Sequence, residues 1–209
     1  MVKRWDDVLE MALGHTGVVL VSLAAAAIIA ITLGLLSWNK SFFASSSLAL
    51  AGIFLTIPAL ALLAFMIPIF GLGWVPTVVA LSVYSLLPIL RNTIVGLRSV
   101  PKQLMEAARG MGMSKSQVLF QIQMPLAWPL ILSGLRVSAQ LIVGVATIAA
   151  YVAGPGFGTY IFRGLASLGS VNALNFAIIG TVGVVILALA IDGLFALVAK
   201  MGLFRSNHV

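Results

Sequence analysis

The sequence predicts an all-α integral membrane protein with about five transmembrane helices. Of its 209 residues, 61% are hydrophobic and only 8% are charged, and the mean hydropathy is +1.16. A soluble domain carries roughly 25% charged residues, so no water-soluble fold of this size could bury so much apolar surface. The apolar residues also form runs that match the roughly 20 residues a helix needs to cross a bilayer.

Five apolar runs of that length are the predicted membrane helices of a single domain, residues 1–209. They are residues 15–36, 48–70, 74–91, 126–150 and 174–199. The first run follows Lys3 and Arg4, as in a signal peptide, but it is long enough to span and no clean small-residue cleavage site follows it. We therefore interpret it as a retained helix.

Prolines interrupt the second and third runs. They are Pro58, Pro68, Pro76 and Pro88. A proline bends a membrane helix and frees a carbonyl, which neighbouring groups or water must then satisfy. The pattern fits ordinary kinks, and it also fits helices that line a pathway of changing shape.

Basic residues predict the orientation in the membrane. Five spans place eight of them on one side: Lys40, Arg91, Arg98, Lys102, Arg109, Lys115, Lys200 and Arg205. The other side has Lys3, Arg4 and Arg163. The positive-inside rule then places residues 92–124 and the C-terminus in the cytoplasm, and the N-terminus outside. Residues 154–172 fall on the outer side, where 159–168 could form a short helix.

A polar, basic segment, residues 92–124, lies between the third and fourth runs. Ser99 can cap a short helix that Pro101 helps to open. Three apolar residues recur at helical spacing and give this helix an apolar stripe: Leu104, Met105 and Ala108. Because such a short amphipathic helix is marginally stable alone, its stripe must contact lipid headgroups or a protein partner.

A glycine turn and a second helix complete this segment. Gly110 and Gly112 end the first helix and allow a tight turn. Residues 114–117, Ser-Lys-Ser-Gln, have the pattern of a capping box. We expect the second helix to end before Pro125, where the fourth membrane helix begins.

The same segment resembles the EAA loop of bacterial ABC-transporter permeases. That motif is Glu-Ala-Ala, three residues, Gly, nine residues, and then Ile-x-Leu-Pro. Glu106-Ala107-Ala108, Gly112 and Ile122-Gln123-Met124-Pro125 match at every spaced position, except that Met124 replaces the Leu. The resemblance implies a type I ABC importer permease fold in the bacterial cytoplasmic (inner) membrane, with residues 92–124 as a cytoplasmic coupling loop.

The resemblance assigns roles to the matching positions. Glu106 would make polar contacts to an ATPase subunit, Ala107 and Ala108 would permit close approach, and Gly112 would allow the turn. The implied partners are two ATPase subunits, a second permease copy or paralogue, and an extracytoplasmic solute-binding protein. The partner ATPase would bind ATP and Mg, and this chain, which has no G-x-x-x-x-G-K-[ST] phosphate loop, would hold no cofactor.

Flanking segments resemble the osmoprotectant permeases, which import glycine betaine, choline, carnitine and related quaternary ammonium compounds. The similar segments are residues 56–63, 67–73, 87–93, 106–113 and 146–150. In that group the binding protein recognises the quaternary ammonium mainly through cation–π contacts with aromatic side chains. We therefore expect an osmoprotectant as the solute, with an amino acid or another small solute as the alternative.

Polar residues inside membrane runs usually face protein or water rather than lipid. On this basis the candidates for a translocation path are Tyr84, Asn92, Thr93, Thr147 and Tyr151. The alternative is that the tyrosines are interface anchors and the threonines bond their own helices. Asp192 in the fifth run could pair with Arg136 in the fourth, although we favour a structural position near the cytoplasmic end.

Two other function classes fit less well. An ion-gradient-driven transporter often shows internal repeats and acidic residues near the midplane, whereas this chain has no visible repeat and one acidic residue in a span. A membrane-embedded enzyme needs paired acid–base groups, but the chain has no cysteine and only two distant histidines, His15 and His208. We predict no catalytic or metal site. The net charge of +7 fits cytoplasmic loops and contact with anionic membrane lipid, so we expect no nucleic-acid partner.

Overall fold

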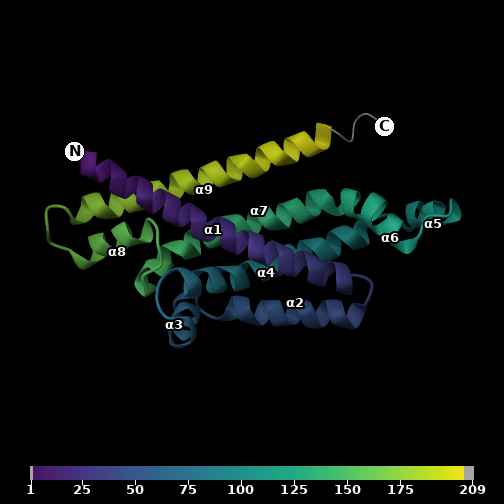
Figure 1. The fold of residues 1–209 in the computed structure, drawn as a ribbon, viewed down its shortest axis with the longest axis horizontal. Helices are drawn as coiled ribbons and strands as arrows, with labels where there is room; N and C mark the ends of the chain where they lie inside the picture. Colours follow the sequence, from purple (N-terminus) through teal and green to yellow (C-terminus); the bar gives the residue numbers. More distant parts are fainter. Residues whose placement is uncertain (1, 205–209) are drawn as a thin grey trace.

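The structure is a computed structural model that describes residues 2–204, with side chains described for residues 5–200. Its regular elements in that range are all helical, which confirms the predicted class (Figure 1). The α-helices are α1 (Val2–Ser37), α2 (Ser41–Thr56), α3 (Ala59–Phe70), α4 (Trp74–Ser99), α5 (Lys102–Gly110), α6 (Lys115–Val118), α7 (Met124–Ile148), α8 (Gly158–Ala166) and α9 (Ala173–Phe204). A π-helix, Leu119–Gln123, joins α6 to α7, and a 3₁₀ turn, Ala149–Val152, follows α7.

Helix α4 is the centre of the bundle, and it packs mainly against α1 and α7. Two glycines allow these close contacts. A Cβ built on Gly34 of α1 would lie 2.5 Å from Thr93 Cγ2, and one on Gly134 of α7 would lie 2.9 Å from the Pro88 carbonyl oxygen. Such distances are too short for real atoms, so only glycine lets the three helices approach this closely. The core between them is filled by fully buried aliphatic side chains, including Ile89 of α4.

Four helical stretches are long and apolar enough to cross a membrane, and a bent helix pair can supply the fifth crossing. The four are residues 5–37, 74–99, 115–152 and 173–200. The predicted second span, residues 48–70, is wrong as a single helix, because α2 and α3 meet at an angle of 96°. Helix α2 has 16 residues, which corresponds to about 24 Å of helix.

The α2–α3 break has a local cause in Pro58. This residue has no N–H to continue the helical ladder, and the Ile57 N–H instead makes a longer, 3.3 Å bond to the Phe54 carbonyl. The break leaves the Ile57 carbonyl free of a helical partner, and the Tyr84 hydroxyl of α4 donates to it. Pro68 and Pro88, by contrast, lie inside α3 and α4.

Three other predicted boundaries differ from the structure. Helix α1 begins at Val2 rather than near residue 15, and α4 continues to Ser99 rather than 91. The helix that begins at Lys115 does not end before Pro125 but runs into α7 through the π-helix. A π-turn widens the backbone where Pro125 lacks an N–H and would crowd the preceding turn of an α-helix.

The polar segments gather at opposite ends of the elongated bundle (Figure 1). Helices α5 and α6 lie at one end, and α8 lies at the other, close to the start of α1. The predicted short helix at 159–168 is confirmed as α8. At the first end, Arg98 Nε donates to the Trp38 carbonyl at 2.7 Å and joins the end of α4 to the end of α1.

Candidate functional site

The α5–α6 segment, residues 100–123, projects from one end of the bundle (Figure 1). Ser99 does not cap α5 as predicted. Because α4 continues through Ser99, its hydroxyl donates back to the Gly96 carbonyl at 2.8 Å, and Pro101 takes the N-cap position of α5. Residues 92–99, which we predicted as loop, therefore belong to the membrane helix α4.

A Schellman motif ends α5 and makes the turn toward α6. The Met113 N–H donates to the Ala108 carbonyl at 3.1 Å, and the Gly112 N–H donates to the Arg109 carbonyl at 2.9 Å. Gly112 has φ +88°, the left-handed value that this motif requires. An L side chain is strained at this φ, so the backbone itself demands glycine at this position.

The capping box of α6 is confirmed. The Ser114 N–H donates to Gln117 Oε1 at 2.8 Å, and the Gln117 N–H donates to Ser114 Oγ at 3.3 Å. Together with the Schellman motif, these bonds satisfy free main-chain groups on both sides of the four-residue connection, residues 111–114. The turn is therefore fixed by local hydrogen bonds.

Buried contacts hold α5 against α6 and the π-helix that leads into α7. Gln123, 3% exposed, places its Nε2 2.8 Å from Met105 Sδ. Ala108 and Val118 are each 1% exposed. Of the predicted apolar stripe, Ala108 is thus covered by the chain itself, whereas Leu104 is 43% exposed. The small size of Ala108 serves packing within the chain.

The outer face of the α5–α6 segment combines a carboxylate with bare apolar surface. Glu106, Ala107 and Gly112 are exposed, and Met111 is 77% exposed. Within the described part of the chain, the Glu106 carboxylate makes no ion pair or hydrogen bond. A rigid segment with this face is well suited to bind another protein.

Three of the five path candidates bond to their own helices. Asn92 Nδ2 donates to the Pro88 carbonyl at 2.8 Å, Thr93 Oγ1 to the Ile89 carbonyl at 2.8 Å, and Thr147 Oγ1 to the Gly144 carbonyl at 2.7 Å. Both threonines therefore bond to their own helices, as the alternative to a role in the path predicted.

The two tyrosines have opposite environments. Tyr84 is 5% exposed and bonds to the α2–α3 break, whereas Tyr151 is 68% exposed and its ring lies 5.7 Å from that of Phe162. Tyr84 and Tyr151 lie on different elements, α4 and the 3₁₀ turn. The five candidates do not form one cluster, and their role in a path stays a prediction.

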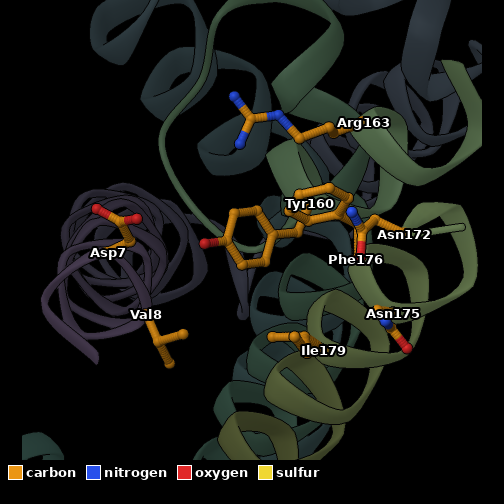
Figure 2. A pocket seen from close by; sticks show the side chains of 8 residues that line it. All are labelled: Asp7, Val8, Tyr160, Arg163, Asn172, Asn175, Phe176 and Ile179. Atoms are coloured by element: carbon orange, nitrogen blue, oxygen red, sulfur yellow. The ribbon is translucent and has the colours of Figure 1, made fainter. Parts of the chain in front are cut away.

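A cleft lies between α1, α8 and α9, at the end opposite the α5–α6 segment (Figure 2). Two cavities of about 390 and 180 Å³ make up this α1–α8–α9 cleft, and Asp7, Tyr160 and Arg163 line both. Tyr160 is 5% exposed, and its hydroxyl points toward α1 in Figure 2. Sequence reasoning missed this cleft, although the five-span topology places Asp7, Glu10 and Arg163 on one side.

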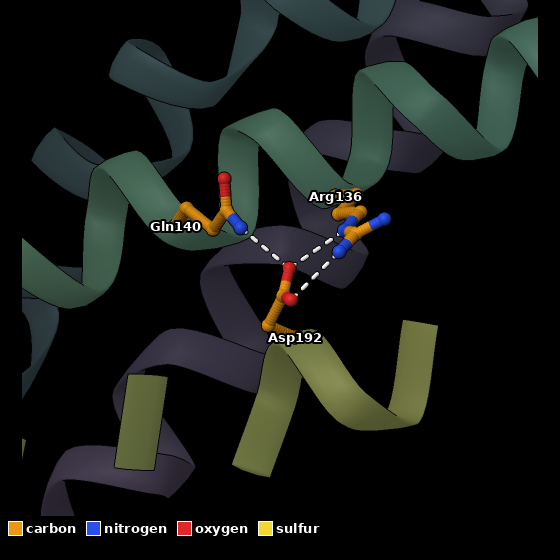
Figure 3. Close-up of polar contacts among 3 residues, drawn as sticks. All are labelled: Arg136, Gln140 and Asp192. Carbon is orange, nitrogen blue, oxygen red and sulfur yellow. Dashed lines mark hydrogen bonds and ion pairs between the residues drawn. The ribbon is translucent and has the colours of Figure 1, made fainter. Parts of the chain in front are cut away.

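An ion pair joins α7 to α9 within the membrane-spanning part (Figure 3). Arg136 Nε and Nη2 donate to Asp192 Oδ1 and Oδ2, each at 2.6 Å. Gln140, one turn along α7, also donates to Asp192 Oδ1. The pairing of Arg136 with Asp192, which we regarded as the less favoured option, is confirmed, whereas the contribution of Gln140 was not foreseen.

A family of transport proteins accounts for both the helices and the projecting segment. Residues 15–201 match the model of the family described as "Binding-protein-dependent transport system inner membrane component". The chain belongs to this family. It is thus a multi-pass inner-membrane subunit of an ABC importer, a transport component rather than an enzyme, and it acts with ATPase and binding-protein partners.

Relatives of this permease match it over most of their length. It is 38% identical over 186 residues to the choline transport system permease protein OpuBB of Bacillus subtilis (strain 168), covering 89% of this chain and 84% of that protein. It is also 38% identical over 195 residues to the osmoprotectant import permease protein OsmY of Salmonella typhimurium, covering 92% and 81%. The carnitine transport permease protein OpuCD of Listeria monocytogenes is 41% identical over 175 residues, covering 84% and 77%.

A solved structure supports the fold of this permease independently. The inward-facing MetNI methionine ABC transporter matches with a TM-score of 0.82, over 96% of this chain and 98% of that chain, at 23% identity. At this identity the likeness concerns the fold alone. It confirms the type I importer permease fold that the EAA resemblance implied.

Proposed function

We propose that this permease translocates an osmoprotectant, such as glycine betaine, choline or carnitine, in an ATP-driven importer. The observation that carries the proposal is the 38% identity over 186 residues to a choline permease, together with relatives named for carnitine and osmoprotectant import. A binding protein delivers the solute. ATP and Mg bind to the partner ATPase, and the permease chain holds no cofactor of its own.

In this proposal the α5–α6 segment is the coupling element. The free Glu106 carboxylate accepts hydrogen bonds from the ATPase, and the short Ala107 side chain lets the two backbones approach closely. Gly112 fixes the turn, and exposed Met111 adds apolar contact. Ala108 acts from inside, because it holds α5 on the chain, and the Gln123–Met105 contact passes movement of α5 to α7.

The assembly contains two ATPase subunits and a second permease, either a copy or a paralogue. Only 6% of the most apolar stretch of α9 is buried within the chain, so α9 has a large surface available for lipid and for that second permease. The α5–α6 segment and the C-terminus face the cytoplasm, and the N-terminus faces outside. The positive-inside rule supports this orientation, because Arg98, Lys102, Arg109 and Lys115 lie at the α5–α6 end.

Among the path candidates Tyr151 has the strongest support. Its ring is 68% exposed on this chain and could meet a quaternary ammonium by a cation–π contact. Tyr84 and Thr93 are buried in the helix core, so they would act by shaping the walls. Asn92 and Thr147 keep their polar groups on their own helices unless the helices move.

The coupling role is tested by co-purification of the tagged permease from its own host in mild detergent. Wild type should retain an ATPase subunit. Glu106→Gln should weaken ATPase binding about tenfold or more, as expected for one lost charge-assisted bond, and Met111→Asp should also weaken it, because it places a charge in the apolar contact. Gln103→Ala, an exposed change on the same helix, is the matched control and should have no effect. Retention of the ATPase by both test variants would contradict the coupling role.

The transport role is tested by uptake of radiolabelled glycine betaine, choline and carnitine in cells that lack other uptake systems. Uptake should survive a proton uncoupler while ATP is maintained. Immediate collapse of uptake at constant ATP would indicate an ion-gradient-driven transporter instead. Uptake of an amino acid but of none of the three compounds would overturn the proposed solute class and leave the ATPase assignment standing.

A further inference from the structure

We propose that the α1–α8–α9 cleft binds a small zwitterion, whose ammonium faces Asp7 and Glu10 and whose carboxylate faces Arg163. The choice of glycine betaine as the first probe rests on the proposed function, but the site itself rests on the geometry of the cleft. The cleft lies at the end opposite the α5–α6 segment. In the proposed orientation this is the end to which a binding protein delivers solute.

Opposite charges line the cleft, and the described carboxylates and the Arg163 guanidinium do not pair with one another. Asp7 on α1 and Arg163 on α8 contribute to the walls of both cavities, and Glu10 adds a second carboxylate to the larger one. Among the described residues, the ion pair that lies within 4.0 Å joins Arg136 and Asp192, not these groups. A cavity that separates a guanidinium from two carboxylates leaves a space that a ligand with both charges can fill.

Tyr160 adds a polar group to the wall of the cleft. Its side chain is 95% buried, yet its hydroxyl has no hydrogen-bond partner among the described residues. Figure 2 shows this hydroxyl directed from α8 toward α1, on the side of Asp7. The hydroxyl therefore reaches the cleft on the Asp7 side, where its oxygen can face the ammonium of a ligand.

Aromatic packing orients Arg163 for this task. Its guanidinium carbon lies 5.3 Å from the centroid of the Phe176 ring, and the Phe176 and Tyr160 rings pack edge-on with centroids 5.3 Å apart. A guanidinium that is stacked in this way loses little freedom on binding, and its planar fork matches a carboxylate in two-point contact. The amides of Asn172 and Asn175 add further polar groups to the smaller cavity.

The mixed charge of the cleft predicts that it binds zwitterions in preference to pure cations or pure anions. A pure cation is repelled by Arg163, and a pure anion is repelled by Asp7 and Glu10, whereas a zwitterion is attracted at both ends. A quaternary ammonium has no N–H, so negative charge must hold it, and Asp7 and Glu10 supply that charge. The larger cavity, about 390 Å³, falls within the roughly 300–1,000 Å³ that is usual for small-molecule sites.

The test is equilibrium binding of radiolabelled glycine betaine to the full chain in lipid nanodiscs. Three competitors test the contribution of each part of the ligand. 3,3-Dimethylbutyrate has the same shape without the positive charge, choline lacks the carboxylate, and glycine keeps both charges but lacks the methyl groups. Glycine betaine should compete at least about tenfold better than 3,3-dimethylbutyrate and choline, as for one lost charge contact. Competition by glycine equal to that by glycine betaine would support a site for zwitterions in general, and weaker competition would support one for quaternary ammonium.

Variants locate the site. Asp7→Asn, Arg163→Gln and Tyr160→Phe should each weaken binding, whereas Asp6→Asn, a matched change at an exposed neighbour that does not line the cleft, should not. Retained co-purification of the ATPase shows that each variant is folded. The proposal is overturned if wild type binds no glycine betaine, if 3,3-dimethylbutyrate competes equally, or if Asp7→Asn and Arg163→Gln bind normally. Absence of glycine betaine binding to wild type that still co-purifies with its ATPase would refute the cleft and not the proposed function.

Discussion

The Tyr84 hydroxyl donates a hydrogen bond to the main-chain carbonyl of Ile57. This bond links the central helix α4 to the break at which α2 turns by 96° into α3. The Ile57 carbonyl has lost its helical partner because α3 begins only at Ala59. A tyrosine that the sequence placed among the path candidates therefore has a clear structural task, which is to satisfy a carbonyl that the α2–α3 break leaves without a helical partner.

Removal of this hydroxyl should loosen the α2–α3 bend. Tyr84→Phe keeps the ring but leaves the Ile57 carbonyl unpaired, which costs about 1–3 kcal/mol for a buried acceptor. We expect a lower Tm of the purified permease in detergent and faster hydrogen exchange near the break. Tyr151→Phe is the control, since this ring is 68% exposed and should leave the Tm unchanged. An unchanged Tm for Tyr84→Phe would mean that another group satisfies Ile57.

The Arg136–Asp192 pair predicts strongly non-additive mutations. Arg136→Leu alone leaves the Asp192 carboxylate without its counter-ion in a membrane span, and Asp192→Leu alone does the same for the guanidinium, so each should lower the Tm. The double Leu variant should recover most of the loss, because no uncompensated charge remains. Thermal unfolding in nanodiscs measures all four members of this cycle, and simple addition of the two losses would show that the groups are not coupled.

Four of the five predicted crossings are continuous helical stretches in the structure, but the shape of the second could not be predicted from the sequence. Hydropathy averages over a run, so residues 48–70 look like one helix although Pro58 divides them. Pro68 and Pro88 are also inside apolar runs, yet they remain inside helices. At Pro58 the preceding residue, Ile57, is extended and the helix ends, and the bond from Tyr84 to the Ile57 carbonyl joins residues distant in sequence, so it becomes visible only in the fold.

In the candidate site, too, some features could be predicted from the sequence and others could not. Local hydrogen-bond patterns made the capping box and the turn glycine readable, because each depends on residues a few positions apart. The Gln123–Met105 contact and the α1–α8–α9 cleft depend on tertiary packing between distant elements, and no short-range pattern marks them. Ala108 is an example of what a motif cannot predict. The motif identifies this residue, but its burial is visible only in the structure.

Gly134 should be intolerant of a side chain because α4 passes directly over it. A Cβ at this position would lie 2.8 Å from Asn92 Cβ and 2.9 Å from the Pro88 carbonyl oxygen, and the Pro88 backbone cannot move freely. Gly134→Ala should therefore destabilise the permease by about 1–3 kcal/mol, the usual range for overpacking. Gly144 lies on the same helix with nothing within 4 Å, so Gly144→Ala should cause no loss. Equal Tm values for the two variants would contradict the close α4–α7 contact.

Gly112 should be required for the conformation of its backbone rather than for space. A Cβ there would meet nothing within 4 Å, but φ is +88°, and an L residue in that region costs about 1–2 kcal/mol. Gly112→Ala should shift the turn, and co-purified ATPase and glycine betaine uptake should fall while the membrane helices stay folded. Gly110 also has open space but an ordinary helical φ, so Gly110→Ala is the matched control and should leave coupling intact. If both variants transport as well as wild type, the α5–α6 turn does not need its Schellman geometry for coupling, and the contact with the ATPase must lie elsewhere on the segment.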